Sequence, residues 1–131
     1  NKFENILAFS QSFHKEDYEG LFLAYETIPM KRNINKKDIT AVITLRKIIR
    51  KYHPDVIYAH SSKAGAVARI ANIGLKHKCV YNPHGWAFSI RTSNWKIKVY
   101  TLIERLAAIF CQKIVCISEF EKKSALVKNI C

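Results

Sequence analysis

Three short polar stretches carry the side chains that could do chemistry. The first, "HSSKAG", begins at His60, the second, "NPHGWAF", holds His84, and the third, "SEFEK", begins at Ser118. A neutral imidazole in a cleft can hydrogen-bond a sugar hydroxyl or transfer a proton. The sequence shows no Ser-His-Asp order, no H-E-x-x-H and no cluster of metal ligands, so nothing in it indicates a hydrolase or a metalloenzyme.

The "HSSKAG" stretch is suited to holding an anion. Ser61 or Ser62 can cap the helix that follows, and the free amides of its first turn then favour a negative charge. Lys63 adds a positive charge, and Gly65 allows a ligand or a neighbouring helix to come close. The pattern is neither a Walker loop nor a dinucleotide fingerprint. The alternative is an ordinary capped helix start with His60 buried beside it.

The "NPHGWAF" stretch predicts a tight turn. Pro83 and Gly85 flank His84, and the aromatic rings of Trp86 and Phe88 follow closely. These rings can stack on a sugar face or simply pack in the core. The structural alternative for His84 is an imidazole that is satisfied by a backbone carbonyl.

The "SEFEK" stretch is explained by helix capping. Ser118 and Glu121 form the S-x-x-E pattern of a capping box. Glu119 is also a candidate acceptor for a substrate hydroxyl, although capping alone accounts for its position.

Alternating strands and helices place these stretches at one edge of a sheet. Apolar runs predict strands over residues 3–9, 21–28, 55–59, 79–82 and 113–117. Helices are predicted over residues 39–52, 63–73, 95–110 and 119–130. The expected buried face of the third helix consists of Val99, Ile103, Leu106 and Phe110.

Short apolar strands joined by helices are typical of right-handed βαβ units and a parallel sheet covered on both faces. We therefore predict an α/β fold, a three-layer sandwich with a mostly parallel sheet. In such sheets ligands bind beyond the carboxyl ends of the strands, which is where all three polar stretches lie.

The net charge of +12 is large for 131 residues and predicts an anionic partner, although solubility alone is a simpler reading.

Asp38 is a plausible cap for the first helix, which has one apolar and one basic face. The basic face consists of Arg46, Lys47, Arg50 and Lys51. We expect this face to suit an anionic membrane surface. No helix-turn-helix or aromatic RNA-binding motif accompanies the charge, so we expect no nucleic acid.

Other features indicate a cytoplasmic globular protein. The longest uninterrupted apolar run, residues 106–111, is far shorter than the ~20 residues of a membrane-spanning helix. No signal peptide pattern is visible. None of the four cysteines forms a C-x-x-C pair, and we expect Cys79 and Cys116 to be buried thiols.

The stretches "HPDVIYAHSSKAGAVARIA", "VYNPHGWAF" and "YTLIERLAAIFCQKIVCISEFEKKSAL" together resemble the amino-terminal domain of bacterial family 4 glycosyltransferases, of the retaining GT-B class. The resemblance covers roughly residues 28–130 and is greatest to members that build capsule, exopolysaccharide or O-antigen chains. It implies a Rossmann-like half of a GT-B fold, with residues 1–131 as the acceptor-side domain. The implied enzyme is a hexosyltransferase that moves a sugar from a nucleotide-sugar donor to a glycan acceptor, which we expect to be lipid-linked, with no metal or other cofactor.

The resemblance also implies roles for residues. His84 matches a family histidine close to the transferring sugar and is the catalytic candidate. The substrate-binding candidates are His60, Ser61, Ser62, Lys63, Gly85, Trp86 and Glu119.

Two features depart from the family pattern. The usual first strand with its glycine-rich loop does not precede Asn1, and no Glu-x7-Glu motif of a donor domain occurs. We therefore expect a domain incomplete at its N-terminus, a missing carboxyl-terminal donor domain and no activity from this chain alone. The alternative is a stand-alone anion-binding module or a regulatory subunit of a split transferase. We expect a cytoplasmic location, peripheral at the inner face of the cell membrane.

Overall fold

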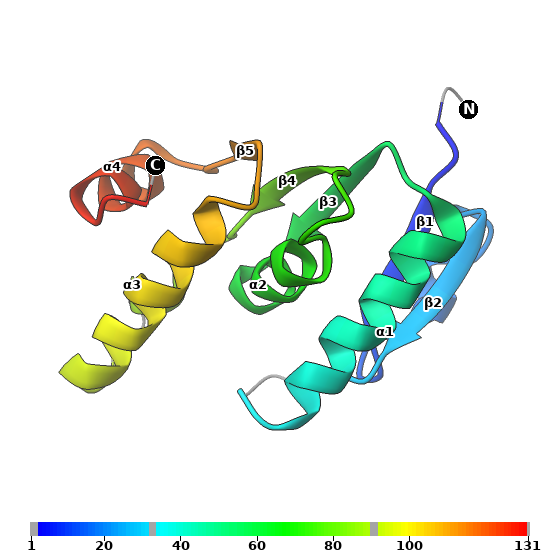
Figure 1. Cartoon of the computed structure of the whole chain (residues 1–131), viewed down its shortest axis with the longest axis horizontal. Coiled ribbons are helices and arrows are strands. Elements are labelled where there is room, and N and C mark those ends of the chain that lie inside the picture. The colour runs from blue at the N-terminus through cyan, green and yellow to red at the C-terminus, as the bar shows by residue number, and fades with distance from the viewer. Residues whose placement is uncertain (1–2, 32–33, 90–91, 131) are drawn as a thin grey trace. The chain divides into compact units, whose positions relative to one another are not determined.

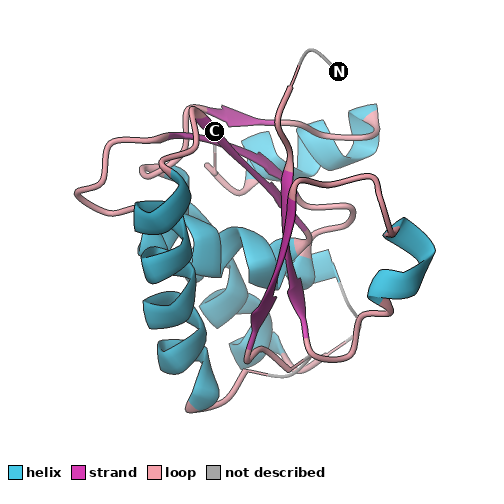
Figure 2. Cartoon of the chain, turned by 90° about the vertical axis from the view of Figure 1, so that its right-hand side faces the viewer, coloured by secondary structure: helices cyan, strands magenta, loops and turns pink. Residues whose placement is uncertain are grey.

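A computed structural model of the chain describes residues 3–31, 34–89 and 92–130. The backbone divides into two compact units, Asn1–Tyr52 and His53–Cys131. Each unit combines parallel strands with helices, which confirms the predicted α/β class (Figures 1 and 2). The described strands form two small sheets, one in each unit.

The first unit is a pair of parallel strands followed by a long helix. Its elements are β1 (Ile6–Ser10), η1 (Lys15–Tyr18), β2 (Ala24–Ile28) and α1 (Lys37–Tyr52). The strands pair in parallel from Ile6 opposite Ala24 to Ser10 opposite Ile28. Both strands begin three residues later than predicted.

The helix α1 buries one face because its apolar residues recur every four positions. Ala41, Leu45 and Ile49 are its buried residues. Asp38 lies inside the first turn, so its predicted capping position is wrong. Its carboxylate accepts a hydrogen bond at 2.9 Å from the backbone N–H of Asn35, in the loop before the helix.

The described part of the second unit alternates three strands with three α-helices, in the predicted order. Its elements are β3 (Val56–His60), α2 (Ser62–Ala71), β4 (Lys78–Asn82), η2 (Ala87–Ser89), α3 (Asn94–Ala108), β5 (Lys113–Ile114) and α4 (Glu119–Val127). The three strands are parallel in the order β3-β4-β5. Helix α2 lies against β3 and β4, and α3 lies beside α2 (Figure 1). Strand β3 is less buried than expected, because Val56 and Tyr58 are about half exposed.

An ion pair lies in the core of the second unit. Arg69 of α2 and Glu104 of α3 are 0% and 3% exposed, and their side chains meet at 2.8 Å. Arg69 Nε also donates to the Gly65 carbonyl, and the Tyr81 hydroxyl donates to the second Glu104 oxygen, both at 2.9 Å. We call these four residues the buried ion-pair cluster. A buried charge is costly unless it is paired and hydrogen-bonded, so the cluster fixes α2, α3 and β4 relative to one another.

The buried face of α3 differs from the prediction. Thr101, Glu104 and Ala107 face inward. Three of the four residues expected to be buried, Val99, Leu106 and Phe110, are exposed. The reason is that the inward face must present Glu104 to Arg69, which turns the apolar stripe outward.

The start of α4 confirms the predicted cap. Ser118 Oγ accepts a hydrogen bond from the Glu121 backbone N–H at 3.2 Å. The Glu121 carboxylate accepts from the Ile117 N–H at 2.9 Å, one residue earlier than in a capping box.

Cys79 is buried as predicted, and burial raises the pKa of its thiol to about 11. Cys116 is only partly buried, which corrects that prediction.

Candidate functional site

Two histidines from different loops meet in the second unit. Nδ1 of His60 lies 2.8 Å from Nε2 of His84, and the rings stack with their centroids 5.1 Å apart. The cause is the register of the parallel strands, which pairs His60 at the end of β3 with Asn82 at the end of β4. His84 follows two residues later, so both imidazoles lie at the carboxyl edge of the sheet. We call this arrangement the histidine pair.

The backbone at His84 is held in a special conformation. His84 has φ of 51°, in the left-handed region that costs about 1–2 kcal/mol for a residue with a Cβ. Its N–H donates to the Asn82 side-chain oxygen at 3.2 Å, and Gly85 follows with φ of 110°. Backbone strain of this kind gathers at functional sites, where the surrounding structure maintains it. The turn at residues 82–85 places His84 just beyond the carboxyl end of β4.

The serines of "HSSKAG" do not cap α2 as predicted. Ser61 is the N-cap residue, but its φ of 71° is unusual and its side chain makes no capping hydrogen bond. Ser62 Oγ instead donates to the Gly85 carbonyl at 3.2 Å. The first turn of α2 is thereby tied to the loop that carries His84.

The surroundings of His60 favour the neutral form of its ring. Burial, and then the neighbouring charge of His84, lower the pKa of His60 below its ordinary value. The ring of Tyr58 lies 4.3 Å from the His60 ring, centroid to centroid. The pair can therefore share one proton between two nitrogens and still present polar atoms to a ligand.

The buried ion-pair cluster lies next to this loop. A Cβ added at Gly65 would lie 2.2 Å from the Tyr81 ring, so the partner that approaches Gly65 is this ring and not a ligand. Burial, and then the Glu104 charge, raise the pKa of the Tyr81 hydroxyl, which keeps it protonated and able to donate.

Trp86 has a packing role that sequence reasoning left open. Its side chain is 2% exposed, and its indole N–H donates to the Glu121 carbonyl at 2.9 Å. Its ring stacks on Phe88 at 5.3 Å. The Trp86 ring is thus packed in the core of the second unit, and its substrate contact stays a prediction. The ring joins the His84 loop to α4.

Two other predicted residues, Glu119 and Lys63, lie on helices α4 and α2. Glu119 is exposed at the start of α4, 3.9 Å from Lys122. Lys63 lies in the first turn of α2 and is partly buried. Sequence reasoning missed Asn82 and Tyr58. The signal for Asn82 was a polar residue ending an apolar strand directly before a proline.

Not every cation on the basic face of α1 is free of an ion-pair partner, because Lys51 is paired with Glu26. Lys51 Nζ and the Tyr52 hydroxyl both donate to Glu26 Oε1 at 2.7 Å. These two hydrogen bonds lower the pKa of Glu26, and the Glu26 contact raises the pKa of Lys51. Lys51 therefore acts as an ion-pair partner of β2. Lys47 and Arg50 are exposed on the same helix, and Arg46 is partly buried.

Neither a membrane span nor a metal-ligand cluster was found in the part of the chain that the structure describes. No helix there is long and apolar enough to cross a bilayer. No group of three or more His, Cys, Asp or Glu side chains gathers in those residues. The expected independence from metals and other cofactors stays a prediction.

Comparisons with known proteins point in one direction. The family pattern of a glycosyl transferase 4-like domain matches residues 15–130. The chain is 29% identical over 118 residues to the O-antigen biosynthesis glycosyltransferase WbnH of Escherichia coli, which covers 89% of this chain and 32% of the relative. It is 35% identical over 106 residues to an uncharacterized 41.2 kDa protein in the cps region of Klebsiella pneumoniae, which covers 76% of this chain and 29% of the relative.

A further relative is the UDP-Gal:alpha-D-GlcNAc-diphosphoundecaprenol alpha-1,3-galactosyltransferase of Escherichia coli. It is 35% identical over 102 residues, which covers 76% of this chain and 26% of the relative. The chain thus spans about a third or less of the length of the curated relatives named here.

Proposed function

The chain belongs to the glycosyl transferase 4-like domain family, and from this premise we propose that it is the acceptor-binding half of a retaining glycosyltransferase. The donor would be a nucleotide-sugar and the acceptor a lipid-linked glycan in surface polysaccharide biosynthesis. The names of two relatives support this, since one specifies O-antigen biosynthesis and another a diphosphoundecaprenol-linked acceptor. The observation that carries the proposal is the histidine pair at the carboxyl edge of a parallel sheet.

In this proposal His84 acts on the donor sugar. Transfer breaks the bond between the anomeric carbon and the diphosphate oxygen and forms a bond to the acceptor hydroxyl oxygen. The hydroxyl proton leaves with the diphosphate or to solvent. His84 Nε2 faces His60, so His84 Nδ1 is the atom that would hydrogen-bond the sugar. This contact would act while positive charge develops on the sugar in the transition state. The diphosphate would be held by positive charge outside this chain, with no metal.

The test is the variant His84→Ala in the protein at its full natural length. We expect kcat to fall about a hundredfold at saturating substrates, the usual loss when one transition-state hydrogen bond is removed. His14→Ala serves as the matched control, because His14 is exposed in the first unit and makes no capping hydrogen bond. Undiminished transfer by His84→Ala would remove the catalytic role from this residue.

The excess of positive charge favours a second candidate, an anion-binding module without catalysis of its own. The two candidates differ in what the histidine pair does. In a binding module, His84→Ala would leave any transfer by a partner protein unchanged and would weaken only anion binding. Full activity of the variant combined with weaker phosphate binding would therefore support the module.

A peripheral location at the inner face of the membrane also belongs to the proposal. Lys47 and Arg50 on α1 are exposed, and cations near an anionic bilayer contribute about 1 kcal/mol each. Such a location would bring the domain close to a lipid-linked acceptor.

A further inference from the structure

The histidine pair brings two ring nitrogens to the same point in space. Nδ1 of His60 and Nε2 of His84 lie 2.8 Å apart, and both side chains are exposed to solvent. A neutral imidazole carries a lone pair on one of its nitrogens, and this lone pair can bind a metal ion as well as a proton. An ion that arrives from solvent can therefore reach two ligands that come from neighbouring strands.

The fold holds both imidazoles in place before any ion binds. Strand register sets His60 opposite Asn82, whose side-chain oxygen accepts from the His84 backbone N–H at 3.2 Å. Ser62 Oγ donates to the Gly85 carbonyl at 3.2 Å and ties the His84 loop to α2. A ligand that binds to groups already in position loses less free energy to their ordering.

The distance between the two nitrogens is close to that of a metal site. Two nitrogens that bind one tetrahedral ion at about 2.1 Å lie about 3.4 Å from each other. The two rings would therefore separate by about 0.6 Å from their present 2.8 Å. The proton between them would move to the far nitrogen of its own ring. Both rings then stay neutral, two coordinate bonds form, and two waters leave the ion.

We propose that the histidine pair is a binding site for a divalent transition-metal ion such as Zn²⁺ or Cu²⁺, and that the bound ion inhibits the enzyme reversibly. Imidazole suits both of these ions. Structural zinc sites have four protein ligands and catalytic sites three. A site with two protein ligands and water in its other positions releases its ion more easily. The ion would therefore act as a regulator and not as a cofactor.

The inhibitory effect rests on the proposed function, in which positive charge develops on the donor sugar beside His84. A divalent ion on His84 Nε2 would place charge of the same sign close to that sugar. It would thereby raise the free energy of the transition state more than that of the bound substrates. We therefore expect the ion to lower kcat rather than to raise KM.

Net charge decides which ions the histidine pair can hold. A chain with a net charge of +12 repels cations, so an ion that prefers oxygen ligands, such as Mg²⁺, gains too little to stay. Zn²⁺ and Cu²⁺ gain more, because nitrogen ligands suit them. Burial, and then the charge of His84, lower the pKa of His60, which keeps this ring in the neutral form that binds metals.

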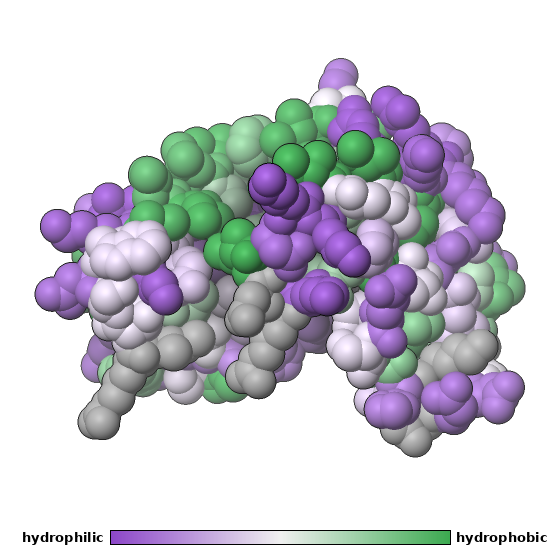
Figure 3. Space-filling view, turned by 90° about the horizontal axis from the view of Figure 1, so that it is seen from below, coloured by the Kyte–Doolittle hydropathy of each residue, from purple (hydrophilic) through white to green (hydrophobic). Residues whose placement is uncertain are grey.

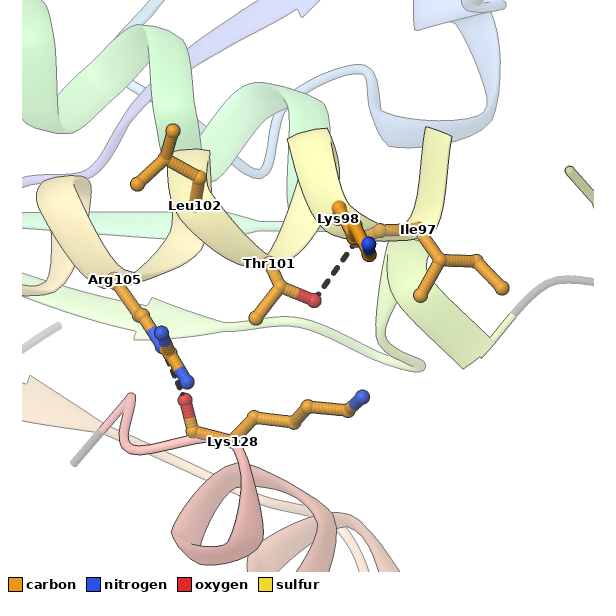
Figure 4. Close-up of a pocket in the computed structure, with 6 residues that line it drawn as sticks. All are labelled: Ile97, Lys98, Thr101, Leu102, Arg105 and Lys128. Carbon is orange, nitrogen blue, oxygen red and sulfur yellow. Dashed lines mark hydrogen bonds between the residues drawn. The ribbon is translucent and has the colours of Figure 1, made fainter. Parts of the chain in front are cut away.

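Other features of the described residues are less suited to a metal ion. The rings of His53 and His77 lie 6.3 Å apart, but His77 Nδ1 donates to the Pro54 carbonyl at 2.7 Å and is not available. Hydrophobic patches, as on the face shown in Figure 3, offer no ligand atoms. The hollow beside α3 in Figure 4 is lined by three cations and by no imidazole, thiol or carboxylate: Ile97, Lys98, Thr101, Leu102, Arg105 and Lys128.

The first experiment measures Zn²⁺ binding by isothermal titration calorimetry on the protein at its full natural length, at about pH 7.5. His60→Gln and His84→Ala should each raise the dissociation constant of this site at least about tenfold, because one of its two ligands is lost. His14→Gln is the matched control. It also removes one exposed imidazole, but from the first unit, and should leave the dissociation constant unchanged.

The second experiment measures sugar transfer with added Zn²⁺ or Mg²⁺, relative to the metal-free rate of the same variant. Zn²⁺ should inhibit the natural protein and His14→Gln at the same concentration, and the chelator EDTA should restore the rate. His60→Gln should need at least about tenfold more Zn²⁺ for half inhibition. Mg²⁺ at the same concentration should not inhibit.

Equal Zn²⁺ affinity in the natural protein, His60→Gln and His84→Ala would overturn the proposed site. Inhibition by Mg²⁺ as strong as that by Zn²⁺, or equal inhibition of His60→Gln and the natural protein, would overturn regulation through the histidine pair. Calorimetry needs no substrate. A protein that binds Zn²⁺ through this pair but transfers no sugar would therefore refute the proposed function and leave the metal site standing.

Discussion

The hydrogen bond between His60 and His84 contains one proton, and its position decides what His84 can offer a substrate. If His84 Nε2 donates to His60 Nδ1, then His84 Nδ1 in its neutral ring is an acceptor. If His60 donates, His84 Nδ1 carries a hydrogen and becomes a donor. In the proposed function His60 would therefore be a positioning residue, because its contact orients the His84 ring and couples the tautomers of the two rings.

The lowered pKa of His60 predicts how stability depends on pH. In the unfolded chain His60 titrates near its ordinary value of about 6.5, and in the folded chain it titrates lower. Between these two values the unfolded state binds more protons, so the free energy of unfolding falls as pH falls below about 6.5. Above that pH, the group is neutral in both states and contributes no pH dependence.

The measurement is urea unfolding followed by tryptophan fluorescence at about pH 7.5 and about pH 5.5. Both tryptophans lie in the second unit, so the signal reports on the unit that contains His60. We expect His60→Gln to show a smaller loss of stability between the two pH values than the natural protein. His14→Ala should show the natural loss. If His60→Gln and the natural protein lost equal stability between the two pH values, the lowered pKa assigned to His60 would be contradicted.

At the scale of elements, the buried ion-pair cluster determines how the second unit is built. Arg69 and Glu104 are 35 positions apart in the chain, and together with Tyr81 they join two helices and the central strand. The Tyr81 ring also lies 4.1 Å from the Arg69 guanidinium carbon. One polar contact therefore sets which faces of α2 and α3 meet.

Glu104→Gln should destabilise the second unit by about 3–5 kcal/mol, because it leaves the Arg69 charge buried without a counter-charge. Glu119→Gln is the matched control. Its carboxylate is exposed and its contact with Lys122 is long, so we expect a change within about 1 kcal/mol. Urea unfolding followed by tryptophan fluorescence measures both. A Glu104→Gln protein as stable as the control would show that the cluster does not hold the helices.

The elements themselves were largely predictable, whereas their inward faces were not. The helices, the succession of strands and helices from β3 to α4 and the Ser118 cap follow from local periodicity and capping chemistry. The buried side of α3 depends on a partner that lies far away in the chain, which no local pattern contains. In the same way, the burial of Trp86 and the left-handed backbone of His84 depend on long-range packing.

At the candidate site, the sequence indicated that His60 and His84 follow neighbouring strands but not that they touch. Strand register decides this contact, and a shift of one residue would turn the His60 side chain to the other face of the sheet. The capping role expected of Ser61 was wrong for a related reason. Its φ of 71° is part of the bend that leads from β3 into α2, and Ser62 bonds the facing loop.

For the whole molecule, the surplus of 22 basic over 10 acidic residues creates a positive field that attracts any anionic surface. A field of this kind weakens as salt is added, because ions screen exposed charges over about 10 Å. Binding that depends on one helix must therefore be separated from binding that depends only on net charge.

Two double variants that lower the net charge equally can separate binding through α1 from binding through net charge alone. Lys47→Gln with Arg50→Gln removes two exposed cations of α1, and Lys113→Gln with Lys123→Gln removes two exposed cations of the second unit. Both double variants lower the net charge from +12 to +10, since each replaces two cations by neutral residues. If α1 contacts the bilayer, the first variant should bind anionic vesicles about tenfold or more weakly, at about 1 kcal/mol for each cation.

The second variant should lose less than about threefold, because its cations contribute only through the screened long-range field. Cosedimentation with phosphatidylglycerol-containing vesicles at low and at physiological salt measures both. Added salt should reduce the difference between the variants without abolishing it, since charges in contact are screened less than distant ones. Equal losses in the two variants would assign membrane attraction to the net charge and remove any special role from the basic face of α1.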